Sequence, residues 1–186
     1  MKLGFLLAMS SLVITCSMAG SARAQNPPER NGFFLGFNVG GGSAKISSDP
    51  NREGGSDFNL RLGGAIKDDL LIGLEISSWL KDQSGTTVFF DAYTAALTYY
   101  PGNQGFFVRG GVGVGSVTVQ SDLGGGVSVS KNENGFGAMA AAGYEWRLTK
   151  KFALGPQAEY VYLNIGGDLV DTANFFDATL GFNWYW

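Results

Sequence analysis

Apolar and polar residues alternate along the final segment of the chain, residues 176–186. The even positions from Phe176 to Trp186 are all apolar, and the odd positions carry mostly polar or small residues such as Asp177 and Asn183. Side chains of a β-strand point alternately to its two faces. The period of two therefore predicts a strand with one apolar face and one largely polar face.

The same period recurs in seven segments further upstream, where the second set of positions is small or polar. The segments predicted as strands are 33–40, 58–66, 70–77, 92–99, 106–114, 136–146, 152–162 and 176–186. Such a succession of alternating segments predicts an all-β fold, either a soluble sandwich or barrel or a barrel in a membrane.

Six charged residues fall in the small or polar set of these segments. They are Arg61, Glu75, Arg109, Glu145, Glu159 and Asp177. A soluble barrel would expose this set to water, whereas a membrane barrel would turn the apolar set to lipid and enclose the charges. Alternation is consistent with both arrangements, so other features have to separate them.

The lengths of the connections favour a membrane barrel. The connections 67–69, 101–105 and 149–151 are short, whereas 44–56, 81–85, 120–134 and 164–171 are mostly longer. Short turns at one end and long loops at the other are typical of barrels in bacterial outer membranes.

Aromatic residues and glycines favour the same interpretation. Many aromatic residues lie at the ends of the segments, and aromatic rings favour the membrane–water interface, so we expect two girdles. The expected members are Tyr99, Tyr100, Phe106, Trp146, Phe152, Trp184 and Trp186 beside the short turns, and Trp79, Phe89, Phe90, Tyr160, Tyr162, Phe175 and Phe176 beside the long loops. Glycines in the inner set suit a narrow, strongly coiled barrel.

The sequence thus predicts one closed antiparallel eight-stranded transmembrane β-barrel over residues 25–186. Within it, Pro156 has no N–H to donate to a neighbouring strand. We expect a bulge or a gap in the hydrogen-bond ladder there.

Residues 1–24 have the features of a secretory signal peptide. A positive start at Lys2 precedes an apolar stretch, and Ala22 and Ala24 supply the small residues of a cleavage site. Such a segment is removed from the mature protein and sends it across the inner membrane. Cys16, the single cysteine, lies within it, and its surroundings fit lipidation poorly.

Composition excludes several functions. The chain contains no histidine, which excludes histidine-based catalysis and histidine metal ligands. Its net charge of −3 gives no basic surface for nucleic acid. Ser128 and Lys131 match a nucleophile spacing but lie in a glycine-rich loop, and the loop carboxylates lack calcium-loop spacing. We therefore expect no enzyme activity, no cofactor and no metal.

The chain resembles the small outer-membrane β-barrel family, which includes OmpA/OmpX-like and opacity-type surface proteins. The resemblance rests on the ending Thr179, Gly181, Trp184 and Trp186, and on the strand-like segments 105–114 and 72–75. That ending is similar to the family's terminal signal for the barrel-assembly machinery, although the last residue is Trp where Phe is more usual. Related enzymes that modify lipids use histidine, so their mechanism does not extend to this chain.

The resemblance implies a fold and a place in the cell outer membrane, since members share these more than an activity. We expect a structural or surface-interaction role, of adhesion type, through the long loops. A narrow channel for small solutes is the alternative, and a lipid-modifying enzyme is a more distant one. Expected partners are outer-membrane lipid and lipopolysaccharide, the assembly machinery, and a host or cell-surface ligand at the loops, with the chain acting as a monomer.

The hairpin around 67–69 predicts one ion pair in the lumen. If the chain folds about Asp68, Arg61 and Glu75 stand nearly opposite each other on the polar face. Either these two residues pair directly, or each joins a wider network with other lumen charges such as Arg109 or Glu159.

Overall fold

A computed structural model describes residues 30–47, 49, 51–83, 85–122, 128–168 and 170–186. The strands are β1 (Phe33–Ile46), β2 (Glu53–Lys67), β3 (Leu70–Gln83), β4 (Thr86–Tyr99), β5 (Phe106–Asp122), β6 (Ser128–Tyr144), β7 (Trp146–Arg147), β8 (Phe152–Asn164) and β9 (Thr172–Tyr185). A 3₁₀ turn, η2 (Pro101–Asn103), follows β4. Because β7 continues β6 past Glu145, the sheet has eight strands, as the alternation predicts.

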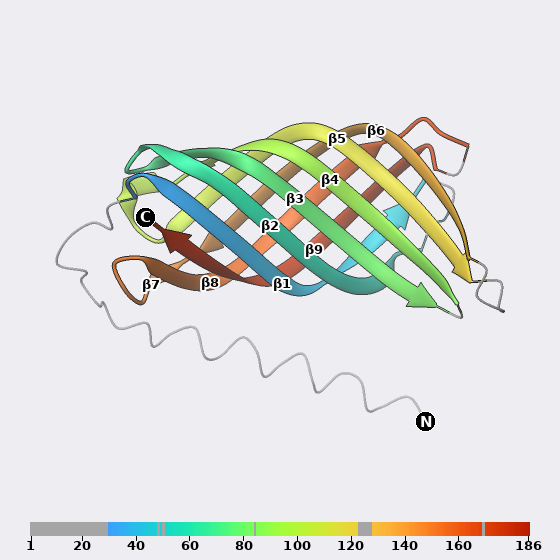
Figure 1. Cartoon of the computed structure of the whole chain (residues 1–186), viewed down its shortest axis with the longest axis horizontal. Helices are drawn as coiled ribbons and strands as arrows, with labels where there is room; N and C mark the ends of the chain where they lie inside the picture. Colours follow the sequence, from blue (N-terminus) through green and yellow to red (C-terminus); the bar gives the residue numbers. More distant parts are fainter. Residues whose placement is uncertain (1–29, 48, 50, 84, 123–127, 169) are drawn as a thin grey trace, which may run out of the picture.

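The sheet closes on itself as an antiparallel barrel (Figure 1). Consecutive strands pair along the chain, and β1 pairs with β9 from Phe34 opposite Tyr185 to Ile46 opposite Ala173. Pairing of β6 with β8 completes the ring. The predicted closed eight-stranded barrel is confirmed.

The two ends of the barrel differ in what they carry. The terminus end holds the start of β1, the end of β9 and the connections around residues 68–69, 100–105 and 148–151 (Figure 1). The opposite end, called the far end below, holds the connections from β1 to β2, β3 to β4, β5 to β6 and β8 to β9. Among the described residues, no helix is long and apolar enough to cross a membrane.

An apolar belt surrounds the outside of the barrel. The predicted apolar positions are exposed, as with Leu74, Leu97 and Val112, while the alternate positions are buried inside. On several strands the outward side chains change from aromatic to polar towards the far end. The last exposed aromatic residue is followed there, two positions on, by a polar residue. These pairs are Phe58 and Ser56, Tyr93 and Asp91, Phe136 and Asn134, Tyr162 and Asn164, and Phe176 and Asn174. The belt has the form expected of a lipid-facing surface.

The aromatic girdles are present, but part of their predicted membership is wrong. Trp79, Phe90, Phe175 and Tyr100 are each less than 5% exposed and point into the barrel. All four lie in the inward phase of the alternation, where Tyr100 continues that phase just past β4. Outward aromatic residues at the terminus end are Phe33, Tyr99, Phe106, Tyr144, Trp146 and Trp186.

The long loops predicted at the far end are mostly strand. β1 runs to Ile46 and β2 starts at Glu53, while β5 runs to Asp122 and β6 starts at Ser128. The hairpins β3–β4 and β5–β6 therefore continue past the apolar belt with mainly polar outward side chains. Ser78 donates to Asp91 and Asn132 donates to Thr118 on the outer face of these extensions.

The predicted ladder gap at Pro156 is confirmed. Pairing between the strands stops at Gly143 opposite Gln157 and resumes at Trp146 opposite Leu154, in unchanged register. On its other side Pro156 stays paired with Leu180 of β9. The gap covers Tyr144, which this register sets opposite Pro156, and Glu145, because the proline ring has no N–H to donate on that side.

We expect Leu180→Arg to destabilise the barrel in a lipid bilayer by about 2–4 kcal/mol, since a charge on the lipid face is costly near the bilayer centre. Asn164→Arg, on the same outward phase but beyond the last aromatic residue of β8, should cost about 0–1 kcal/mol. Denaturant unfolding in phospholipid vesicles measures both. Equal costs for the two variants would contradict the position of the belt.

Candidate functional site

The barrel interior is filled by three layers of side chains. An aromatic and ionic layer lies at the terminus end, a layer of charged and amide side chains lies in the middle, and an apolar cluster lies towards the far end. An eight-stranded barrel is only wide enough for its own side chains to fill it. The interior and the far-end mouth are therefore the two places where function can be sought.

Glu145 is the centre of the layer at the terminus end. It sits where β6 gives way to β7, and its carboxylate is buried. Tyr185 Oη donates to it at 2.9 Å, Asn183 Nδ2 at 3.2 Å and Tyr100 Oη at 3.3 Å. The ladder gap opposite Pro156 thus lies beside the most heavily hydrogen-bonded carboxylate of the interior.

Arg30 closes this end of the barrel. Its side chain is fully buried, although it precedes β1, and its Nη2 lies 3.0 Å from Glu145 Oε1. The guanidinium stacks 3.4 Å from the centre of the Tyr100 ring and donates to Asn103 and to the Gln104 carbonyl. Arg30 is not predicted as a lumen residue because it lies outside every alternating segment of the sequence.

Arg109 joins two carboxylates in the middle layer. Its Nε lies 2.8 Å from Glu75 Oε2, and its Nη2 lies 3.3 Å from Glu159 Oε2. Glu159 also accepts hydrogen bonds from Ser77 and Asn59. All of these side chains are buried, so their pairing crosses the lumen between strands that are not neighbours.

Arg61 and Glu75 stand directly opposite each other, as the hairpin register predicts. Their contact is long, 3.9 Å from Arg61 Nε to Glu75 Oε1, and it is not bidentate. Arg61 instead donates from Nη2 to Asn183 Oδ1 at 2.7 Å and to Asn38 at 3.3 Å. The direct Arg61–Glu75 pair and the wider network, predicted above as alternatives, are therefore both present. The contacts of the wider network are the shorter ones.

Asp177 differs from the other five lumen charges, because it has no ion pair among the described residues. Asp177 is fully buried, and neither carboxylate oxygen has a hydrogen-bond partner among the described residues. Asp57 is buried in the same way, with 2% exposure. Neither of its carboxylate oxygens has a hydrogen-bond partner within the described part of the chain. Asp57 was missed because the predicted strand began one residue later, at Phe58.

An apolar cluster blocks the lumen above the charged layer. Trp79 stacks on Phe90 with ring centres 5.3 Å apart, and Val117, Leu163 and Phe175 pack with them. These three aliphatic and aromatic side chains have no measurable exposure. A cluster of this kind, stacked on a layer of paired charges, leaves no wide aqueous path along the axis.

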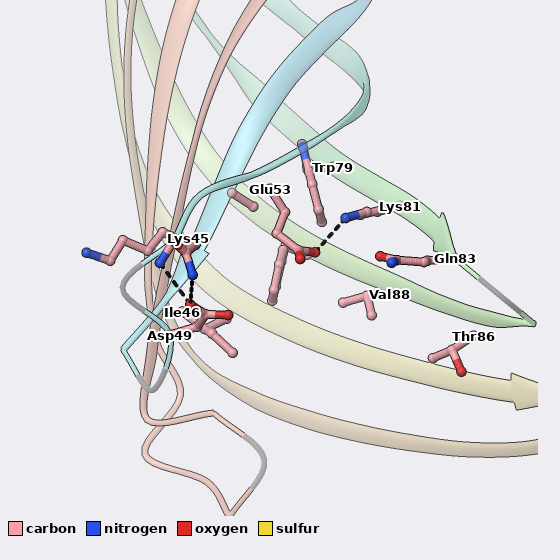
Figure 2. Close-up of a pocket in the computed structure, with 12 residues that line it drawn as sticks. Lys45, Ile46, Asp49, Glu53, Trp79, Lys81, Gln83, Thr86 and Val88 are labelled. Atoms are coloured by element: carbon pink, nitrogen blue, oxygen red, sulfur yellow. Dashed lines mark hydrogen bonds and ion pairs between the residues drawn. The ribbon is translucent and has the colours of Figure 1, made fainter.

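A pocket of about 310 Å³ opens at the far-end mouth above this cluster (Figure 2). Trp79, Val88 and Phe90 give the pocket an apolar lining. Lys81 and Glu53, which also line it, form an ion pair of 2.8 Å (Figure 2). The remaining lining residues are Ala44, Lys45, Ile46, Asp49, Asn51, Gln83 and Thr86. The pocket combines an apolar surface with charged groups at its rim, as ligand sites do.

The four residues of the terminal motif lie on β9 or just past its end. Thr179 and Gly181 face the interior, where a side chain on Gly181 would meet Asn38 Oδ1. Trp184 packs against Phe152 on the outside, and Trp186 is exposed and donates its N–H to the Phe33 carbonyl. They are spread over both faces and do not form one site, so their role in assembly stays a prediction.

The six charges expected in the lumen are all buried inside the barrel. The structure brings Glu75, Arg109 and Glu159 into one network with Arg61 at its edge. It sets Glu145 apart with Arg30 and Arg147, and gives Asp177 no ion pair among the described residues. No three acidic, histidine or cysteine side chains of the described chain converge as a group that could hold a metal ion.

The family described as outer membrane protein beta-barrel domain matches residues 12–184. The chain belongs to this family. No curated protein matches the sequence significantly. Among solved structures, Neisserial surface protein A is similar with a TM-score of 0.65 and 17% identity, covering 84% of this chain and 98% of that one.

A second similar structure is Ail, the attachment invasion locus protein of Yersinia pestis, solved with the heparin analogue sucrose octasulfate. The TM-score is 0.60 at 15% identity, covering 82% of this chain and 99% of that one. At these identities the similarity establishes the fold of the barrel and leaves its ligands open.

We expect Arg30→Ala to lower the free energy of unfolding by about 3 kcal/mol, since removing one member of a buried ion pair strands the other. Glu145 keeps its tyrosine and asparagine donors, which places the cost at the low end of the usual range. Denaturant unfolding measures it, and Arg52→Ala on the exposed far-end surface is the matched control. A cost equal to that of the control would show that Arg30 does not close the barrel.

Double-mutant cycles should separate the two contacts of Glu75. Coupling between Arg109 and Glu75, at 2.8 Å, should be about 1–3 kcal/mol, and coupling between Arg61 and Glu75, at 3.9 Å, should be less than half of that. Methionine replaces the charged residues in both cycles so that side-chain length is kept. Larger coupling in the Arg61 cycle would overturn the ranking of the two contacts.

Proposed function

We propose that this barrel is a surface-interaction protein that binds its partner at the far-end mouth, and that it does not act as a channel or an enzyme. The observation that carries the proposal is the contrast between the two regions of the molecule. The lumen is packed with side chains. At the far-end mouth, in contrast, the β1–β2 and β3–β4 hairpins line an open pocket with apolar side chains.

The direction in which the barrel is inserted into the outer membrane follows from the signal peptide and from the lengths of the connections at its two ends. A signal peptide over residues 1–24 would deliver the chain across the inner membrane, and the far end would face outwards, because outer-membrane barrels keep their shorter turns on the periplasmic side. Lipid and lipopolysaccharide would then surround the belt, the assembly machinery would read the terminal motif, and the barrel would act as a monomer.

The charges at the far end favour a partner that presents cationic groups. Exposed or partly exposed acidic residues outnumber basic ones in this region. The acidic residues are Asp49, Glu53, Asp82, Glu133, Asp168 and Asp171, and the basic residues are Lys45, Arg52, Lys81 and Lys131. A sulfated polyanion such as the one bound to Ail would meet net repulsion here, so that ligand is not carried over.

The absence of histidine from the chain supports a binding role over the lipid-modifying alternative. The closed lumen supports it over a channel. A passage for solutes would require the stacked Trp79 and Phe90 rings and the Arg109 network to separate together.

Binding is tested on the folded barrel in nanodiscs with two fluorescent probes, a short basic peptide containing a leucine or phenylalanine and a sulfated heparin fragment. We expect salt-sensitive binding of the peptide and none of the heparin fragment. Changing Asp82, Asp168 and Asp171 to asparagine should weaken peptide binding several-fold. Matched changes of Asp68 and Asp69 at the terminus end should leave binding unchanged.

Planar-bilayer recordings test the closed lumen separately. The wild-type barrel should give no stable open-channel current, because the apolar cluster and the ionic layer fill its cross-section. Steady unitary conductance would establish the channel function instead, and stronger binding of the heparin fragment than of the peptide would overturn the cationic partner.

A further inference from the structure

Two buried carboxylates flank a glycine stretch inside the barrel. Gly40 of β1 lies opposite Asp57 of β2 on one side, and Gly42 of β1 lies opposite Asp177 of β9 on the other. Both glycines occupy the inward phase of β1, so no side chain of this strand stands between the two carboxylates. The closed ring of strands turns the inward side chains of β2 and β9 towards one lumen.

The glycines are required by the backbone as well. A Cβ on Gly42 would lie 2.5 Å from the Phe176 carbonyl oxygen, and one on Gly40 would lie 2.3 Å from the Ala178 carbonyl oxygen. β1 therefore approaches β9 closely at this level.

The charges at this level of the lumen do not balance. The two guanidinium groups, those of Arg61 and Arg109, contact Glu75 and Glu159. Asp57 and Asp177 are left with four carboxylate oxygens that have no hydrogen-bond partner among the described residues. A buried ionised carboxylate without a partner carries a large desolvation cost, so a compensating group is required.

Further oxygen atoms without partners border the two carboxylates. Asn59 Oδ1 belongs to the next inward residue after Asp57 on β2, and Thr179 Oγ belongs to the next inward residue after Asp177 on β9. Both residues are more than nine-tenths buried, and neither atom has a hydrogen-bond partner within the described chain. Carboxylate, amide and hydroxyl oxygens are the ligands that hard cations take.

We propose that Asp57 and Asp177 form a buried binding site for a hard divalent cation of the calcium class, with Asn59 and Thr179 as further oxygen ligands and water in the remaining positions. Two carboxylates match the charge of one such ion. Because no third acidic side chain of the described residues completes a direct ligand group, water has to supply part of the coordination. The apolar cluster with Trp79 and Phe175 covers the site from the far end, so the ion enters during folding.

Terbium luminescence provides a direct test, because Trp79 stands opposite Asp57 in the β2–β3 ladder. The other described tryptophans are at the terminus end: Trp184 lies on β9, Trp186 lies just past it, and Trp146 lies on β7. The full barrel is refolded in detergent with Tb³⁺, and emission is excited through tryptophan. We expect sensitised emission from the wild type, its loss in the Asp57→Asn, Asp177→Asn variant, and its retention in an Asp82→Asn, Asp168→Asn control on the exposed far-end surface.

Thermal unfolding with and without calcium is the second measurement. Calcium at about a hundred times its dissociation constant should raise the Tm of the wild type by roughly 5–10 °C and should not change that of the Asp57→Asn, Asp177→Asn variant. Trp79→Phe should lose the sensitised emission and keep the calcium-dependent shift. The Trp79→Phe variant thus distinguishes loss of the tryptophan that sensitises the emission from loss of the cation site.

Heat-modifiable migration in gels verifies that each variant is folded. If the double aspartate variant does not fold, the single Asp177→Asn variant and the calcium response of the wild type still decide the outcome. Emission that survives the loss of both carboxylates, or a wild-type Tm that does not respond to calcium, would overturn the proposal. The first result would place the ion at another site, and the second would indicate that the two carboxyl groups hold protons instead.

Discussion

In a membrane, every backbone N–H and C=O of a sheet has to find a partner within the sheet, and this requirement shapes the whole molecule. It forces β1 to meet β9 and β6 to meet β8, which closes eight strands into a narrow ring. Closure then gives each strand one face for lipid and one for a lumen that side chains fill. Charges on the inner face must find compensation across the lumen, as Arg109 does with Glu75 and Glu159.

The sequence predicts the strands well wherever apolar and polar residues contrast, and less well where both faces are polar. The stretch 120–134 carries polar residues on both phases, such as Ser130 and Asn132 on one and Lys131 and Glu133 on the other. Nothing in this pattern distinguishes strand from loop, although its described part is strand. Aromatic character alone predicts Trp79, Phe90 and Phe175 at the lipid interface. Their inward phase was visible in the sequence and determines their position.

Partners within one hairpin are predictable and partners across the lumen are not. The position of Arg61 opposite Glu75 follows from the turn at 68–69 and the period of the strands. The tighter contact of Glu75 with Arg109 depends on the shear of the barrel, which is the offset of the strands along one another around the ring. No local sequence pattern predicts this offset. Arg30 precedes the alternating region altogether, so its entry into the terminus end follows only from the three-dimensional packing around Glu145.

The seam between β1 and β9 joins the first strand of the chain to the last. The ribosome has to complete β9 before that seam can form. Until then each of these two strands presents an open edge, and the contacts that close the barrel link residues separated by most of the sequence. A slow final step of folding, and a need for protection of two exposed edges in transit, are therefore built into the order of the strands.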